Sequence, residues 1–458
     1  MNTAPFMLRK GALLGLMACG ASLRAWDDGT KMSHVAGRSH SHRLHVTDFG
    51  AVGDNRTDVT AAFEEAVAAS AGLLGHTTIL VAPGTYRLFP ISLASRMTLH
   101  LAAGATLLGM PFGSSTAAWP LISALPRWSR GRGDTITVKG TGQSAKLPRN
   151  ESKALLHGAN LDDVSIRGEG RTSVIEMHGW DWSSRPGWSG SHPSLMRFVR
   201  STNVRVLNVQ LRNSPYWTCH FWECDRVHVS RVSIIAPLDS VNTDGWDPDS
   251  SSNVLIEESS YEGGDDCVSV KSGWDCFGIE NGQPSTNITV RGLTCKGPRA
   301  GIAIGSEVSG GVHNVSVEHV HFVDTGCMVH LKTGHTRGGA VSNIRFSKLT
   351  AVGTLGDGIV INTGFRSNSR CPKGWMPPAM TRMSDIKFVH IDASNATITG
   401  YSFDFGAKHA NPPEFYFSKM ELRLEDVHLP RGRRGAWRCG VVTKLSTAHV
   451  TPKHACYE

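Results

Sequence analysis

Short runs of alternating apolar and polar residues recur along most of this chain. Each run contains Asn or Asp at a turn and then carries apolar side chains at every second position. This alternation predicts strands that bury one face and expose the other. The eight runs are Asn160–Ile166, Thr202–Val206, Cys224–Val229, Ser252–Ile256, Thr286–Val290, His313–Val317, Ser342–Phe346 and Ser384–Phe388.

The spacing of these runs predicts how the strands are arranged. From Val204 to Ile386 the equivalent apolar positions lie between 23 and 42 residues apart. One coil of a β-solenoid takes roughly 20 to 30 residues, and the excess belongs in loops on one side, where a cleft forms. An immunoglobulin-like sandwich would lack this recurring register. We therefore predict an all-β fold, a right-handed parallel β-helix, over residues 45–430.

Different elements are expected at the two ends of the solenoid. A strand at His45–Phe49 should precede a short helix at Val59–Ala69, with Thr57 or Asp58 at its N-cap. The helix would cap the first coil, because an exposed apolar end would aggregate. Residues 431–458 are expected to pack as a tail on the last coil, and the segment Ser367–Pro378 is expected to be a long loop.

The N-terminus has the features of a secretory signal over residues 1–25, followed by a flexible polar segment at 26–44. Arg9 and Lys10 precede the apolar stretch Gly11–Ala21, which is too short to span a bilayer. The stretch Leu16–Cys19 also resembles a bacterial lipoprotein cleavage site, which would place lipid on Cys19. We expect a secreted protein, extracellular or in a cell wall, that does not span a membrane.

Composition narrows the choice of compartment and partner. The chain has 458 residues, 10 cysteines and a formal net charge of +8. Cysteines at this frequency fit disulfide bonds in an oxidising compartment, and five sequons fit a glycoprotein. The charge suits either solubility or attraction to an acidic polymer. The basic residues are scattered, which argues against nucleic acid. The sequons begin at Asn55, Asn150, Asn287, Asn314 and Asn395.

Two short acidic stretches carry the strongest chemical signal. Asp244 lies in Asn242–Gly245, and Asp265 and Asp266 lie in Gly263–Cys267, one coil later. Asp266 should therefore lie about 4.8 Å above Asp244. Three crowded carboxylates repel one another, so catalysis explains them better than folding, although Asp turns between strands would also place them here. Adjacent strand residues point to opposite faces, so a bend at the two glycines is required.

The motifs resemble one known family. Asp48–Asp54 is weakly specific, whereas Asn213–Trp217, Asn242–Gly245, Gly264–Cys267 and Gly301–Glu307 are more specific. Together they resemble glycoside hydrolase family 28, the polygalacturonase family, in its plant and bacterial branch. The resemblance implies inverting hydrolysis of an α-1,4 bond beside galacturonic acid in pectin, without a cofactor. It makes Asp265 the general acid, while Asp244 and Asp266 hold and deprotonate the water. Inverting enzymes separate acid and base by about 6.5–9.5 Å, so the side chains should splay apart.

The substrate clamp departs from the family pattern. The family's Arg-Ile-Lys is His330-Leu331-Lys332 here, and its Gly-His-Gly is Arg299-Ala300-Gly301. Lys332 keeps one cation, and a protonated His330 could replace the missing arginine. Homogalacturonan, rhamnogalacturonan, substituted pectin and exo-action on oligomers all stay open. The expected substrate-binding residues are Lys332, His330, Glu307, Ser306, Asn242, Lys271, Trp217 and Trp274, with Trp246 as a further aromatic platform.

Cysteine and histidine positions give the remaining expectations. Cys267 and Cys295 should form a disulfide across one coil, with a stacked pair of buried thiols as the alternative. Cys219 and Cys224 are another possible pair. No His or Cys cluster has metal-ligand spacing, so we expect no metal.

Two rival functions remain at this point. A polysaccharide lyase on the same scaffold would use calcium and a basic residue, and a non-catalytic β-helix would only bind glycans. For the hydrolase we expect a monomer whose partner is an acidic plant cell-wall polysaccharide.

Overall fold

The computed structural model describes the part of the chain that forms the solenoid. The described residues are 41–111, 119–123, 125, 135–137, 144–146, 150–179, 192–365, 371, 375–406, 420–434, 437–439 and 444–453. The expected signal segment therefore lies outside them, as does most of the expected polar segment and much of the Ser367–Pro378 loop.

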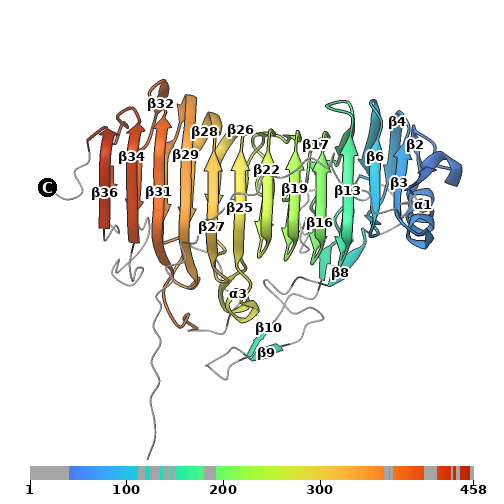
Figure 1. The fold of residues 1–458 in the computed structure, drawn as a ribbon, viewed down its shortest axis with the longest axis horizontal. Coiled ribbons are helices and arrows are strands. Elements are labelled where there is room, and N and C mark those ends of the chain that lie inside the picture. The colour runs from blue at the N-terminus through green and yellow to red at the C-terminus, as the bar shows by residue number, and fades with distance from the viewer. Residues whose placement is uncertain are drawn as a thin grey trace, which may run out of the picture. The chain divides into compact units, whose positions relative to one another are not determined.

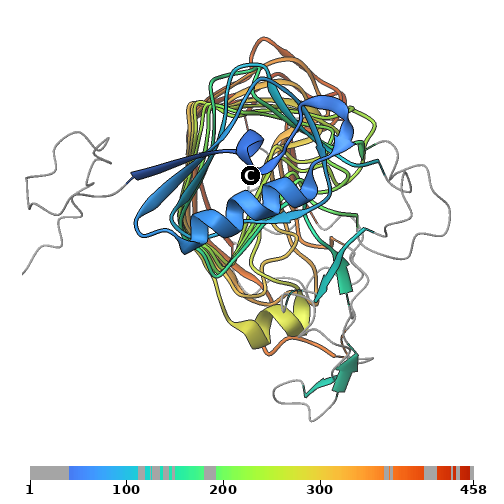
Figure 2. The same ribbon diagram turned by 90° about the vertical axis from the view of Figure 1, so that its right-hand side faces the viewer.

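The described strands form three rows that run along a stack of coils. Within a row, each strand pairs in parallel with the equivalent strand of the next coil, as β16, β19 and β22 do. Figure 1 shows one row as a series of parallel arrows, and Figure 2 looks along the stack. The predicted all-β fold and parallel β-helix are confirmed.

The first row holds the runs recognised from the sequence. Its strands are β1 (Ser41–His45), β3 (His76–Val81), β6 (Met97–Leu101), β13 (Asp162–Gly168), β16 (Thr202–Leu207), β19 (Asp225–Ser230), β22 (Ser252–Glu257), β25 (Ser285–Arg291), β27 (Val312–Glu318), β29 (Ala340–Leu355), β31 (Arg382–Asp392), β34 (Met420–His428) and β36 (Lys444–Thr451).

The second row forms the floor of the cleft described below. Its strands are β5 (Ile91–Ser92), β12 (Leu156–Ala159), β15 (Met196–Val199), β18 (Cys219–Trp222), β21 (Trp246–Asp249), β24 (Val268–Val270), the second halves of β26 (Thr294–Ile304) and β28 (His321–Lys332), β30 (Asp357–Asn362), β33 (Phe403–Gly406) and β35 (Trp437–Cys439).

The third row completes each coil. It comprises β2 (Asp54–Asp58), β4 (Gly84–Leu88), β7 (Ala105–Gly109), β14 (Val174–Glu176), β17 (Gln210–Arg212), β20 (Ser233–Ile235), β23 (Ser260–Glu262), the first halves of β26 and β28, the end of β29, and β32 (Ala396–Ile398). Two small antiparallel pairs lie beside the coils, β8 (Leu121–Ser123) with β11 (Asn150–Ser152), and β9 (Thr135–Thr137) with β10 (Ser144–Lys146).

The core is a column of apolar side chains stacked coil on coil. Val204 pairs with Val227, which pairs with Val254, and the column continues through Ile288. All four side chains are buried in one continuous apolar cluster. Because burying a side chain of this size contributes roughly 1.5–3 kcal/mol, the repeated column fixes the register of the coils.

The recurring Asn has a backbone role. Asn253, Asn287, Asn314 and Asn343 all have φ between 54° and 58°, a left-handed conformation that Asn tolerates better than most residues. Their amides also form a ladder, in which Asn287 Nδ2 donates to Asn253 Oδ1 at 2.9 Å and Asn343 Nδ2 donates to Asn314 Oδ1 at 3.2 Å. The turn residue recognised in the sequence therefore shapes each coil and joins it to the next.

The N-terminal end differs in part from the expectation. The first strand is Ser41–His45, and the residues expected to be a strand, Val46–Phe49, form a 3₁₀ turn instead. The capping helix is present as α1 (Thr60–Gly72), but its N-cap is Val59, so the expectation of Thr57 or Asp58 at that position is wrong. Asp58 Oδ1 still accepts a hydrogen bond from Thr60 N at 3.0 Å just before the helix. Figure 2 shows α1 lying across the end of the stack.

The C-terminal end also differs. Strand β35 pairs with β33, and β36 pairs with β34, so the described residues beyond 436 add strands to the coil. They therefore extend the stack where a tail packed over it was expected. No helix among the described residues is long and apolar enough to cross a membrane.

The cysteines are connected partly as predicted. Cys267 and Cys295 form a disulfide with 5.8 Å between Cα atoms, which confirms that pair. Cys219 and Cys224 are both buried thiols, so their predicted pairing is wrong. A second disulfide joins Cys276 in the helix α3 (Asp275–Asn281) to Cys371. The two residues are 95 positions apart, and no repeat spacing signals that pairing.

Candidate active site

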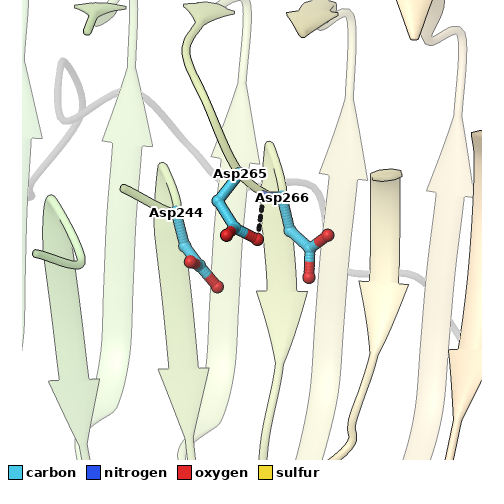
Figure 3. Close-up of side chains that lie close together, drawn as sticks. All are labelled: Asp244, Asp265 and Asp266. Carbon is cyan, nitrogen blue, oxygen red and sulfur yellow. Dashed lines mark hydrogen bonds between the residues drawn. The ribbon is translucent and has the colours of Figure 1, made fainter. Parts of the chain in front are cut away.

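Two neighbouring coils bring three carboxylates together. Asp244 lies just before β21, and Asp265 and Asp266 lie just before β24. Trp246 pairs with Val268 across these strands, and Gly245 N donates to Asp266 O at 2.9 Å. This register places Asp266 one coil beyond Asp244. Figure 3 shows the three side chains side by side.

A bend in the backbone lets both adjacent aspartates face the same way. Residues 263–267 have no strand geometry, and two glycines make the bend possible. A Cβ on Gly264 would lie 1.8 Å from Ser240 O, and one on Gly263 would lie 2.5 Å from the Tyr261 hydroxyl. That hydroxyl accepts a hydrogen bond from Asp265 N at 3.1 Å and so holds the bend. No side chain larger than hydrogen fits at either glycine.

The three carboxylates are closer together than the acid–base separation expected of an inverting enzyme. One oxygen of each lies within 4.8 Å of the other two, so the side chains do not splay apart. Asp244 and Asp266 are 3% and 2% exposed, whereas Asp265 is half-buried. Asp265 is also held in place, because its Oδ2 accepts from Asn242 N and its Oδ1 from Asp266 N, both at 2.9 Å.

Two lysines, the buried Lys271 and the half-buried Lys332, neutralise part of this negative charge. Lys332 Nζ lies 2.6 Å from Asp266 Oδ2. Lys271 Nζ lies 3.4 Å from Asp244 and from Asp247, and 3.8 Å from Glu307. Burial would lower the pKa of Lys271, but the carboxylates of Glu307 and Asp244 outweigh it and raise that pKa well above its usual value. Both lysines are therefore cations at any working pH.

The pKa values of Asp244 and Asp265 are raised, whereas the pKa of Asp266 is lowered. Burial raises the pKa of Asp244 to about 7, against the opposing charge of Lys271. Burial, followed by the Asp266 charge, also raises the pKa of Asp265. Burial would raise the pKa of Asp266 too, but Lys332 and Lys271 outweigh it and lower that pKa. A protonated Asp265 and an ionised Asp266 can therefore coexist at a pH between their two pKa values.

All the expected catalytic and substrate-binding residues except Trp246 line one cleft of about 670 Å³ around the acids. His330 contacts the Phe365 ring edge-on at 6.5 Å between centroids, and Ser306 Oγ lies 3.4 Å from Glu307 Oε2. The full lining is Tyr216, Trp217, Val241, Asn242, Asp244, Asp265, Asp266, Lys271, Trp274, Pro298, Arg299, Ala300, Ser306, Glu307, Gly326, Cys327, His330, Lys332, Arg337, Asp357, Val360 and Phe365.

The three tryptophans have different environments. Trp246 is fully buried in the core, so the expectation that it stacks on a sugar is wrong. Trp217 is 4% exposed, with Lys271 Nζ 4.5 Å from its ring centroid. Trp274 is half-buried, and Arg337 packs over its ring at 5.0 Å. Trp274 is therefore the more accessible of the two tryptophans in the cleft.

Several cleft residues were not identified from the sequence. Arg337 is buried, pairs with Asp275 and donates to Ser306 O at 2.8 Å, which braces the wall that carries Trp274. Phe365 and Asp357 come from loops or strand starts without a recognisable motif. Arg299 stood out in the sequence only because it departs from the family's Gly-His-Gly motif. Such a departure can itself mark a residue of the cleft.

The fold and the acidic cleft define a parallel β-helix enzyme of the carbohydrate-cleaving class. A family model described as "Glycosyl hydrolases family 28" matches residues 125–447, and the chain belongs to that family. It is therefore a glycoside hydrolase. A second model, "Rhamnogalacturonase A/epimerase, pectate lyase-like", matches residues 44–111, which precede all three acids. The lyase alternative is accordingly not favoured.

Similar proteins agree with this assignment. A "Probable polygalacturonase" of Vitis vinifera is 31% identical over 437 residues, which cover 93% of this chain and 82% of the relative. Among solved structures, an exopolygalacturonase of Thermotoga maritima has a TM-score of 0.63 at 23% identity, covering 89% of this chain and 91% of that one. A family 28 exopolygalacturonase of Yersinia enterocolitica has a TM-score of 0.66 at 16% identity, covering 92% and 77%. The two structures support the fold alone.

Proposed function

We propose that this protein hydrolyses galacturonosyl linkages of pectin with Asp244, Asp265 and Asp266 as its catalytic residues. The observation that carries the proposal is the convergence of three carboxylates whose pKa values shift in opposite directions, inside a cleft that also holds two lysines. The polygalacturonase relatives support pectin as the substrate class. The basic net charge suits an acidic polymer.

Asp265 acts as the general acid. Its raised pKa keeps the proton on the carboxyl, and it is the most exposed of the three, so it can reach the bridging oxygen. As the bond between C1 and the bridging oxygen breaks, the electron pair goes to the oxygen and the Asp265 proton follows it.

Asp266 acts as the base toward the attacking water. The Lys332 cation keeps it ionised, so it accepts a proton as the water oxygen bonds to C1. Asp244 carries a proton below pH 7 and holds the water by hydrogen bonding. A direct attack of this kind inverts the anomeric centre.

Lys332 and His330 bind the carboxylate of the uronate. Both line the cleft and lie on β28, one strand beyond β26 and two beyond β24, which follows the acids. Lys332 supplies a point charge, and His330 adds a hydrogen-bond donor where an arginine fork would otherwise bind in a bidentate manner. Trp274 offers an aromatic face to the sugar ring.

The N-terminal sequence and the family suggest where the protein works. We propose that it is secreted as a monomer into the extracellular space or cell wall and binds neither nucleic acid nor membrane. Mass spectrometry of the mature protein from culture medium would locate the cleavage site. A mature chain that keeps residues 1–25, or carries lipid on Cys19, would contradict this placement.

The function is tested by product chemistry. With polygalacturonate, the enzyme should release reducing ends without ultraviolet absorbance from an unsaturated uronide, and chelator should not slow it. Asp265→Asn should lower kcat by at least about 10³-fold because the acid is lost. Asp239→Asn, an exposed acid in a nearby loop, is the matched control and should be unaffected. An unsaturated product would indicate a lyase, and full activity of Asp265→Asn would refute the acid role.

A further inference from the structure

The cleft extends unequally on the two sides of the acids. Beyond them toward the C-terminus it is lined by residues of three successive coils, represented by Ala300, Cys327 and Val360. Toward the N-terminus the described lining ends at Tyr216 and Trp217, one coil before Asp244. The acids therefore lie close to one end of the cleft.

The row of floor strands nevertheless continues past that end. In register, Asp247 pairs with His220, His220 with Arg197, and Arg197 with His157. These positions alternate with core residues such as Phe221 and Phe198, so they face outward from the coil. An open groove would leave them accessible to a polymer lying along the coils.

A first wall covers this floor at His220. The Trp217 ring packs edge-on against the His220 ring, with 5.0 Å between centroids. His220 is 1% exposed and also binds Asp249 at 3.1 Å. Lys271 holds the Trp217 ring from the side of the acids. Trp217 therefore acts as a barrier across the floor.

A second wall covers the next floor position. Arg197 is 1% exposed and pairs with Glu151 of β11 at 2.6 Å. Glu151 Oε1 also accepts a hydrogen bond from Leu125 N at 3.0 Å. Strand β11 pairs with β8, so a two-stranded sheet lies over the floor at this point. A buried, hydrogen-bonded ion pair resists displacement, because removing one partner would leave a buried charge.

We propose that the enzyme acts on chain ends and not within the polymer. This rests on the proposed function. About two strand spacings, or ~10 Å, separate the Asp244 coil from the Arg197 coil, and Trp217 occupies part of that length. The N-terminal side of the cleft, which Trp217 and the β8–β11 pair close, therefore accepts one terminal uronate. The rest of the polymer lies on the open, C-terminal side, along β26, β28 and β30.

The mode of action is tested by comparing viscosity with reducing ends on polygalacturonate. Chain-end action should leave most of the viscosity when a few per cent of bonds are cut, and the first product should be a single uronic acid. A rapid fall in viscosity with a mixture of oligomers would overturn the proposal while leaving the proposed hydrolysis intact. Absence of cleavage on any galacturonan would instead refute the proposed function.

A pair of variants tests the barrier itself. Trp217→Ala should open the closed side, so that dimers or longer fragments appear among the first products. Trp274→Ala removes an aromatic ring from the same cleft and should change the rate but keep the single-unit product. If Trp217→Ala folds, as judged by its circular dichroism, and still releases only single units, Trp217 is not the barrier.

A separate observation concerns Arg299. Its side chain is exposed at the cleft, and none of the described acidic residues pairs with it. Val268 pairs with Ile302, so in register Arg299 lies one coil beyond Asp265. The backbone there is anchored, because Ala300 N donates to Asp266 Oδ1 at 3.2 Å. The nearby Lys332 is already paired with Asp266.

We infer that Arg299 is a specificity residue that binds the carboxylate of the uronate on the open side of the acids. An arginine fork can bind a carboxylate in a bidentate manner, which the lysine and histidine on β28 cannot do. Arg299 thus supplies the recognition that position 330 lacks. This assignment too rests on the proposed function.

The inference is tested by binding, so that it does not depend on turnover. In the Asp265→Asn background, Arg299→Gln should weaken the binding of trigalacturonate about tenfold. It should leave the binding of the methyl ester of trigalacturonate unchanged, because the ester has no carboxylate for the guanidinium to bind. Arg345→Gln changes an exposed residue on β29, in the first row, and is the matched control. Equal loss for acid and ester, or no loss for the acid, would overturn the inference.

Discussion

In the proposed mechanism, Lys332 acts on the chemistry through Asp266. Its ammonium group lies 2.6 Å from that carboxylate and lowers a pKa that burial would otherwise raise. The same side chain lines the cleft, where it can also meet the substrate. At the scale of single residues, the active site is a set of charges whose burial and pairing set the proton on each acid.

Removing that cation should change the pH dependence in a defined direction. In Lys332→Met the pKa of Asp266 rises, because burial is no longer opposed, and the base is ionised only at higher pH. The acid limb of kcat/KM should therefore move up by about one pH unit or more. A pH–rate profile measures this. If the acid limb of the kcat/KM profile of Lys332→Met does not move while KM rises, Lys332 only binds substrate.

The sequence predicted some of these residues better than others. The aspartates were predicted because their motifs recur one coil apart, and spacing alone puts Asp266 beside Asp244. The burial of Lys271 among three carboxylates could not be predicted, because those partners come from different coils. Arg337 had no signal at all, since its partner Asp275 is the first residue of α3, 62 positions away.

The left-handed Asn near the start of the first-row strands is the feature that repeats from coil to coil. Asn253, Asn287 and Asn314 combine a left-handed backbone with amides that bond from coil to coil. Two of the expected sequons, at Asn287 and Asn314, lie within this ladder. Because a glycan would occupy the same amide, we expect these two sequons to stay unmodified.

Substitution at Asn287 separates the two roles of the turn residue. Asn287→Ala loses the ladder bond and puts a residue that tolerates the left-handed conformation less well than Asn at φ 58°, so it should cost about 1–2 kcal/mol. Asn287→Gly loses the same bond without the backbone strain and should cost less. Thermal or denaturant unfolding compares them. Equal losses would show that the left-handed conformation contributes nothing.

Element types followed from periodicity wherever a segment repeated. The first-row strands and α1 were predicted because strand alternation and the apolar face of a helix are local signals. Val46–Phe49 was mistaken for a strand, although its two apolar residues lie three positions apart, which is the period of a 3₁₀ turn. The walls formed by Trp217 and by the β8–β11 pair depend on long-range packing, which no local pattern records.

The whole solenoid is a stack in which each coil contacts only its neighbours. Its N-terminal end depends on α1, whose Phe63 is fully buried and meets Tyr86 edge-on at 5.9 Å. The active site lies several coils away. Damage to the cap should therefore spread only partly toward the acids.

Phe63→Ala tests this independence. The cavity should cost about 3–5 kcal/mol locally and expose an apolar end that promotes aggregation. Hydrogen exchange should rise over the first coils, while kcat of the soluble fraction stays near the wild-type value. Exchange that rises equally at β21 and β24, with kcat falling in parallel, would show that the stack unfolds as one unit.

Stereochemistry tests the central claim, which is that adjacent coils present a proton donor and a water-activating carboxylate to one bond. Proton NMR of the first product from an α-linked oligogalacturonate reads the anomer before it equilibrates. Direct attack by water predicts the β-anomer, even though the carboxylate oxygens lie within 4.8 Å of one another. An α-anomer as the first product would mean that a carboxylate attacks the sugar, which would contradict the proposed roles of all three aspartates.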